Sequence, residues 1–195
     1  MALPDSVKYV QGTSYIFAFD TDWPASPTQG WSATVDAEID LGGKTNGTYQ
    51  QSVKLDLGVN RYPLYFAEIS VEFDSDSTAG GTVNVHHGYS HSATAGTGNP
   101  IGLTGTDAAY TGYGGGVLAN CVNQLPLLGK PFSLIASNDA DAAPQVGELG
   151  FFVPRKRYMM ILVGNLGGAT LGSGGTGLAD ELAIRITGFD IQTQD

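Results

Sequence analysis

The sequence is poor in charge, poor in basic residues and almost free of cysteine. Charged residues make up 14% of its 195 positions, against about 25% in typical soluble domains. The formal net charge is −10, which argues against nucleic acid or an anionic membrane as a partner, because both select clustered Lys and Arg. Because Cys121 is the single cysteine, the chain can form neither an internal disulfide nor a cysteine-only zinc site. Its apolar neighbours favour a buried, inert thiol.

Targeting and helical signals are also missing. The first residues, Met-Ala-Leu-Pro-Asp, contain neither a basic region nor an apolar core, so we expect no signal peptide. No apolar run approaches the length of a membrane span. The best helical candidate, 117–128, is interrupted by Pro126. We therefore expect a chain that folds in a cytoplasm, without a membrane partner.

Period-two alternation of apolar and polar residues predicts β-strands along most of the chain. The clearest run is 65–73, and similar runs occur at 31–41, 51–57, 83–89 and 182–191. Residues 158–163 are apolar on both faces and predict a central strand, with shorter candidates at 132–136 and 151–153. Near the start, 7–10 and 15–19 predict two strands joined by a turn at 11–13.

The 28 glycines, about twice the usual share, punctuate these runs. Many short strands with Gly-rich turns predict an all-β fold, either jelly-roll-like or a related antiparallel β-sandwich with long Gly-rich loops. We expect a single domain overall. In it, 46–195 form the sandwich and 1–45 form an N-terminal arm or strands that can reach another subunit.

Residues 93–116 form a long segment with hardly any charge. Loops of this length are uncommon in compact domains unless they are functional or disordered. Tyr110 and Tyr113 are amphipathic anchors of the kind found at interfaces, so the segment is either an arm that orders against a neighbour or a floppy surface loop. Together with Trp23 and Trp31, they are the residues that we predict to contact another subunit.

No arrangement of polar residues matches a known catalytic or metal motif. Alternation places His86 and His87 on opposite strand faces, and with His91 they fit no zinc spacing, so surface or interfacial histidines are expected. Asp74 and Asp76 superficially suggest calcium, but a hairpin turn explains them equally well.

Paired carboxylates of a glycosidase remain conceivable, because the chain contains four glutamates that could meet in space: Glu68, Glu72, Glu148 and Glu181. The two tryptophans, however, lie in an early Pro- and Ser-rich segment rather than beside these acids. We therefore expect no enzymatic activity, no catalytic residue, no cofactor and no metal. The basic cluster 155–157 could dock an acidic patch or a phosphate, or could simply flank a solvated loop.

Several strings in the middle and C-terminal parts resemble a family of small structural proteins of tailed bacteriophages and prophages. They are VEFDSDSTAGGTV at 71–83, SATAGTGN at 92–99, DAAYTGY at 107–113, QVGELG at 145–150 and PRKRY at 154–158. The resemblance covers about 50–191 and implies a virion component. It carries over no functional residues.

Within that resemblance, a low-charge β-sandwich with a long Tyr-bearing loop fits a capsid decoration or cement protein. We expect it to form a homotrimer and to bind the major capsid protein or other virion proteins, after a stage in the host cytoplasm. A tail, baseplate or adaptor component is the first alternative. A carbohydrate-binding β-sandwich, with exposed Trp and Tyr stacked on sugars, is the second.

Overall fold

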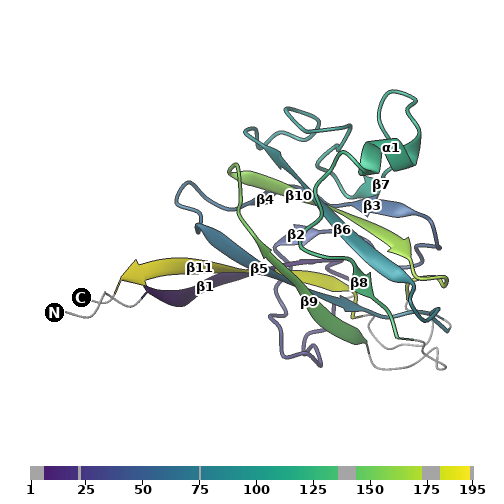
Figure 1. Cartoon of the computed structure of the whole chain (residues 1–195), viewed down its shortest axis with the longest axis horizontal. Coiled ribbons are helices and arrows are strands. Elements are labelled where there is room, and N and C mark those ends of the chain that lie inside the picture. The colour runs from purple at the N-terminus through teal and green to yellow at the C-terminus, as the bar shows by residue number, and fades with distance from the viewer. Residues whose placement is uncertain (1–6, 22, 75, 136–143, 173–180, 194–195) are drawn as a thin grey trace.

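The computed structural model describes residues 7–21, 23–74, 76–135, 144–172 and 181–193, which form two β-sheets packed face to face (Figure 1). Sheet A contains, in spatial order, β2 (Ala37–Glu38), β1 (Val7–Ala18), β11 (Ala183–Thr193), β5 (Leu64–Val71) and β9 (Gln145–Phe152). Sheet B contains β7 (Ala108–Ala109), β3 (Tyr49–Gln51), β10 (Tyr158–Leu166), β6 (Thr82–Ser90) and β8 (Phe132–Ser133), while β4 (Leu55–Asp56) also pairs with β10.

The long strands pair antiparallel, and among the described residues only the short β1–β2 pair is parallel. Eight strands, β1, β3, β5, β6, β8, β9, β10 and β11, can be numbered one to eight along the chain. Sheet A then contains the first, eighth, third and sixth, and sheet B the second, seventh, fourth and fifth. The predicted all-β sandwich is confirmed, and this order is consistent with a jelly roll.

The described helical structure consists of one short helix, α1 (Leu118–Val122), which lies over the outer face of sheet B (Figure 1). Within the described ranges, no helix has the length and apolar character needed to cross a membrane.

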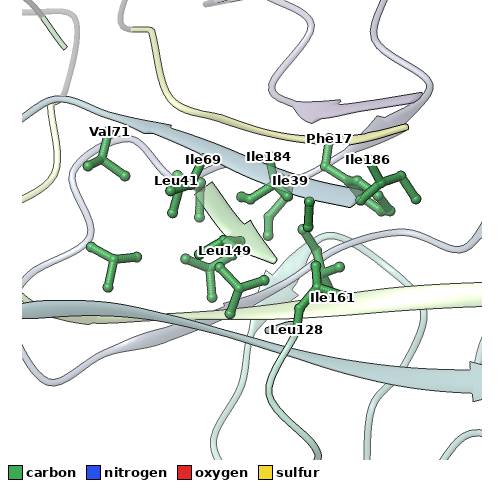
Figure 2. Close-up of a cluster of buried hydrophobic side chains, with 14 of the residues drawn as sticks. Phe17, Ile39, Leu41, Ile69, Val71, Leu128, Leu149, Ile161, Ile184 and Ile186 are labelled. Atoms are coloured by element: carbon green, nitrogen blue, oxygen red, sulfur yellow. The ribbon is translucent and has the colours of Figure 1, made fainter. Parts of the chain in front are cut away.

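The core fills the space between the sheets. Figure 2 shows Ile69, Val71 and Ile184 from sheet A on one side and Ile161 from sheet B on the other. The predicted alternation is confirmed in β5 and β11, whose alternate side chains are buried here. The predicted central strand is confirmed as well, because β10 is buried on both faces.

Three predicted strands are shorter than their patterns suggested. The expected 51–57 strand is divided, because β3 ends at Gln51 and β4 contains only Leu55–Asp56. Only Ala37–Glu38 of the expected 31–41 strand pairs with β1, although Ile39 and Leu41 are buried as predicted. The Asp36 carboxylate accepts the Ile16 amide at 2.8 Å, a hydrogen bond that a neighbouring strand carbonyl would otherwise receive. In the described part of the expected strand at 132–136, which ends at residue 135, the strand consists of Phe132–Ser133.

The predicted turn at 11–13 is wrong. Residues 7–18 form one continuous strand, and the Gly-containing segment is a bulge in its pairing with β11 between Gln11 and Ser14. Sequence patterns cannot separate these two outcomes, because glycine favours both tight turns and bulges.

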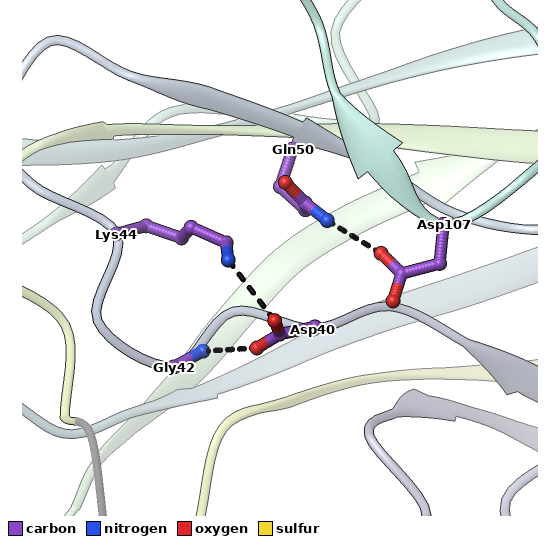
Figure 3. Close-up of polar contacts among 5 residues, drawn as sticks. All are labelled: Asp40, Gly42, Lys44, Gln50 and Asp107. Atoms are coloured by element: carbon purple, nitrogen blue, oxygen red, sulfur yellow. Dashed lines mark hydrogen bonds and ion pairs between the residues drawn. The ribbon is translucent and has the colours of Figure 1, made fainter.

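The N-terminal segment belongs to the sandwich. Strand β1 lies between β2 and β11 in sheet A, and Phe17 and Ile39 are in the core. The turn that follows is closed by Asp40, which accepts the Gly42 amide at 3.0 Å and pairs with Lys44 at 3.1 Å (Figure 3). Whether residues 1–45 also reach another subunit stays a prediction.

Strands β1 and β11 continue past the rest of sheet A as a two-stranded ribbon. Strand β5 stops pairing with β11 at Phe189, whereas β1 pairs with β11 as far as Val7 opposite Thr193. In Figure 1 this ribbon projects away from the body of the molecule.

Tyr62 packs at the base of this ribbon. Its hydroxyl lies 3.1 Å from the Thr13 amide and accepts that hydrogen bond. Its ring occupies the space beside two glycines: a Cβ added to Gly12 or Gly188 would lie 2.2 or 2.1 Å from a ring carbon. The bulge therefore makes room for Tyr62, which ties the ribbon to the sandwich.

Replacing Gly188 with Ala should destabilise the fold, because the new methyl group would displace the Tyr62 ring. We expect a loss of about 1–3 kcal/mol in the free energy of unfolding, typical of overpacking, measured by chemical denaturation. In a Tyr62→Ala background the same substitution should cost much less. Equal losses in both backgrounds would contradict the role given to Tyr62.

Candidate functional site

The four aromatic residues predicted to contact another subunit lie in different environments. Trp23 and Trp31 are buried against each other, with ring centroids 6.1 Å apart. Tyr110 is also buried, and its hydroxyl donates to the Ile101 carbonyl at 2.5 Å. Tyr113 is 65% exposed. Intersubunit contact stays a prediction for all four, but within one chain only Tyr113 offers its side chain to a partner.

The two tryptophans cover part of the outer face of sheet A. They pack on three buried residues of β1 and β11: Ile16, Ala18 and Ala183. The Trp23 indole donates to the Ser32 carbonyl at 2.9 Å, and the Arg185 guanidinium lies 4.8 Å from the centre of the Trp31 ring. Cation–π contact of this kind fixes the ring further.

The glycine-rich segment 93–116 folds over the outer face of sheet B. Its strand β7 pairs with β3, and the Gln50 amide donates to Asp107 at 2.5 Å (Figure 3). Leu103 and Tyr110 join a second apolar cluster with β10 and the α1 region. The floppy-loop alternative does not fit a segment that packs in this way.

Lys54 fixes the beginning of the same segment. Its ammonium donates to the carbonyls of Ser92, Thr94 and Thr97 at 2.9, 2.6 and 3.0 Å, and to the Ser90 hydroxyl at 3.2 Å. Burial lowers the pKa of Lys54. Hydrogen bonds from a charged donor are stronger than neutral ones, so a single side chain holds this loop in place.

Elsewhere on the outer face of sheet A, several apolar side chains of the described residues remain partly exposed. Tyr9 lies directly opposite Ile191, and Phe189 is two residues before Ile191 on the same strand face. On β5, Leu64 pairs with Phe189, and Phe66, two residues later, pairs with Phe151 of β9. We call these six residues the aromatic strip: Tyr9, Leu64, Phe66, Phe151, Phe189 and Ile191.

The aromatic strip is continuous and partly exposed. The ring centroids of Phe66 and Phe151 are 4.8 Å apart, and those of Phe151 and Phe189 are 6.2 Å apart. Phe151 is 59% exposed and Tyr9 is 58% exposed. The strip crosses β9, β5 and β11 and runs onto the ribbon. Contiguous exposed apolar surface of this kind marks interaction sites in soluble proteins.

The sequence contains the strip residues but does not connect them. Phe66 and Phe189 lie at the polar positions of runs that alternate, which was the available signal that they are on the wet face. Their grouping depends on the register of four strands that are far apart in the sequence: β1, β5, β9 and β11. No local pattern encodes that register.

The histidines do not converge on a common site. His86 and His87 lie on opposite faces of β6, as predicted. We expected surface or interfacial histidines; a surface position is wrong for these two, since both are buried within the chain, and an interfacial position stays a prediction. The His86 Nδ1 lies 3.0 Å from the Leu125 carbonyl, whereas His91 is exposed. Among the described residues, no group of three or more His, Cys, Asp or Glu could hold a metal.

The four glutamates are partly used in structural contacts. Glu68 lies opposite Glu148 in register, but it forms an ion pair with Arg185 at 2.6 Å. Glu181 accepts the Thr28 amide at 2.8 Å, which ties the tryptophan segment to sheet A. These contacts give Glu68 and Glu181 a structural role. Cys121 is buried, as predicted.

His87 lies on the core side of β6, against two aromatic rings. Its ring centroid is 4.9 Å from that of Tyr89 and 5.9 Å from that of Phe152. Burial, followed by the nearby charges of Arg155 and His86, lowers the pKa of His87 to about 4. The ring is therefore neutral at pH 7.

Comparison with protein-family models, with curated proteins and with solved structures gives no match. What the chain does must therefore be argued from its own surface and from the sequence.

The neutral His87 should make stability depend on pH. Its folded-state pKa lies below the value of about 6.5 in an unfolded chain, so the unfolded state takes up a proton first as the pH falls. The stabilisation is complete above about pH 6.5 and is lost toward pH 4. We expect the free energy of unfolding to fall by about 2 kcal/mol between pH 7 and pH 5.

Chemical denaturation across this pH range would measure the effect. His87→Phe should remove most of the slope, because Phe fills a site between aromatic rings without titrating. His91→Gln should keep the slope, because His91 is exposed. A His87→Phe variant with an unchanged slope would contradict the assignment.

Proposed function

We propose that this chain is a non-enzymatic structural subunit that assembles through the aromatic strip, and that its assembly is a bacteriophage virion. Within a virion, the role that we favour is capsid decoration or cement. The observation that carries the assembly part is the strip itself: one part of the outer face of sheet A is covered by Trp23 and Trp31, and the other part is left apolar. The phage part is supported by the sequence resemblance.

The chemistry of the aromatic strip favours self-association of the chain. A chain with a net charge of −10 repels its own copies over most of its surface, but the strip contains no charged side chain. Apolar contact there would bring copies together where repulsion is weakest. The two-stranded ribbon carries Tyr9 and Ile191 beyond the body of the molecule.

A trimer could form through contacts between the ribbon and the body of neighbouring copies. The ribbon end of the strip in one copy, with Tyr9 and Ile191, would lie on the phenylalanine side chains of the strip in the next copy. Such a head-to-tail contact closes into a ring when the rotation between copies allows it. The closed ring would then bind the major capsid protein through surface outside the strip.

A carbohydrate-binding role has weaker support. Sugar platforms use exposed tryptophan or tyrosine, whereas Trp23, Trp31 and Tyr110 are buried and Tyr113 stands alone. A tail, baseplate or adaptor role uses the same assembly chemistry. It differs from decoration in its binding partner, since only decoration requires affinity for capsid shells.

Light scattering of the purified chain would test the proposal. We expect three times the mass of one chain for the unmodified protein. Phe151→Ser should weaken association by at least about tenfold, or roughly 1.4 kcal/mol, because it removes an exposed aromatic ring from the β9 end of the strip. Co-sedimentation with capsid shells would support decoration, and a ring or tube without affinity for shells would favour the tail.

Val117→Ser is the matched control. Val117 is exposed beside α1, over sheet B, so its loss should leave the mass unchanged. A monodisperse monomer that binds no phage component would overturn the assembly proposal. Equal effects of the two substitutions would overturn the part assigned to the strip.

A further inference from the structure

A pocket with a volume of about 210 Å³ lies beside β6. Strand β8 pairs only with the first two residues of β6, and further along β6 the wall is completed by the segment after α1 and by the turn between β9 and β10. The residues that define its chemistry are His87, Pro100, Leu125, Pro126, Arg155 and Lys156.

Two cations line this pocket. Arg155 and Lys156 form no ion pair with any residue in the described part of the chain. The adjacent Arg157 differs, because it pairs with Asp56 at 2.6 Å. In a strongly acidic chain, cations that line a pocket and form no ion pair among the described residues favour an anionic ligand.

His87 adds an unpartnered polar group to the wall. The residue is 6% exposed, and its buried Nδ1 has no hydrogen-bond partner among the described residues. Buried polar atoms almost always have a partner. A neutral imidazole has one N–H donor and one acceptor nitrogen, so a carboxylate that reaches the Nδ1 in its N–H form would satisfy this buried group.

The size of the pocket limits the ligand. Sites for drug-sized molecules have volumes of about 300–1,000 Å³, and this pocket is smaller. Pro100, Leu125 and Pro126 provide an apolar wall that suits a short hydrocarbon stem. Proline has no amide hydrogen to donate, so these residues do not form the ring of N–H donors that binds free phosphate.

We propose that this pocket binds the carboxylate of an acidic side chain inserted by a neighbouring protein subunit, with Arg155 and Lys156 neutralising the charge. The stem of that side chain packs on the apolar wall, and His87 also lines the pocket. The pocket shares no residue with the aromatic strip, so the inference stands or fails independently of the role given to the strip.

Nuclear magnetic resonance of the full chain at pH 7 tests this assignment through the ring nitrogens of His87. The probe is acetyl-Leu-Glu-amide at about millimolar concentration, the range expected for one anchoring side chain. We expect a saturable shift of the His87 nitrogens. With acetyl-Leu-Gln-amide, which has the same shape without the charge, the affinity should fall by about tenfold or more.

Substitutions test whether the positive charges of Arg155 and Lys156 bind the peptide carboxylate. Replacing both Arg155 and Lys156 by Gln should weaken binding of the Glu peptide by about tenfold, and these side chains make no ion pair in the described chain whose loss would unfold it. Lys130→Gln removes an exposed charge that does not line the pocket and should bind like the unmodified protein.

Three results would overturn the proposal. The first is the absence of any saturable shift of the His87 nitrogens. The second is equal affinity for the Glu and Gln peptides. The third is tighter binding of inorganic phosphate than of the Glu peptide, which would identify a site for a free anion instead of a protein side chain.

Discussion

Both sheets of this sandwich carry apolar side chains on their outer faces. Exposure of these side chains to water is unfavourable, so each outer face needs a further layer to cover it. On sheet B, Met160 and Leu162 of the central strand are covered by the segment that contains Tyr110 and by α1. On sheet A, the segment with Trp23 and Trp31 covers only one part. The loops that surround the sandwich are therefore the outer layers of its packing, and the aromatic strip is the face that they leave open.

That division of the surface explains why assembly is the function we favour. Burial of apolar area is the main favourable term in association, and the strip offers it without a charged side chain in a chain with a net charge of −10. The ribbon extends the same face beyond the body, and Tyr62 fixes its base. We propose that the pocket at Arg155 and Lys156 makes a second, charge-based contact through different residues.

Patterns confined to one segment predicted the fold well. The alternation from Tyr65 and the doubly apolar run of β10 gave the inner strands, because both depend only on which face meets the core. The bulge at Gly12 was predicted as a turn, because its cause, the Tyr62 ring, is distant in sequence. The strip was missed for the same reason: Phe66, Phe151 and Phe189 become neighbours through strand register, which no single segment specifies.

Hydroxyl-radical footprinting of the dilute and the assembled protein tests the central claim most directly, because it reports the exposure of individual side chains. If assembly uses the strip, oxidation of Tyr9 and Phe151 should fall sharply on assembly. Tyr113, equally exposed in one chain but on the loop over sheet B, should remain reactive. Protection of Tyr113 with unchanged oxidation of Tyr9 and Phe151 would contradict the account and return the contact to the glycine-rich loop.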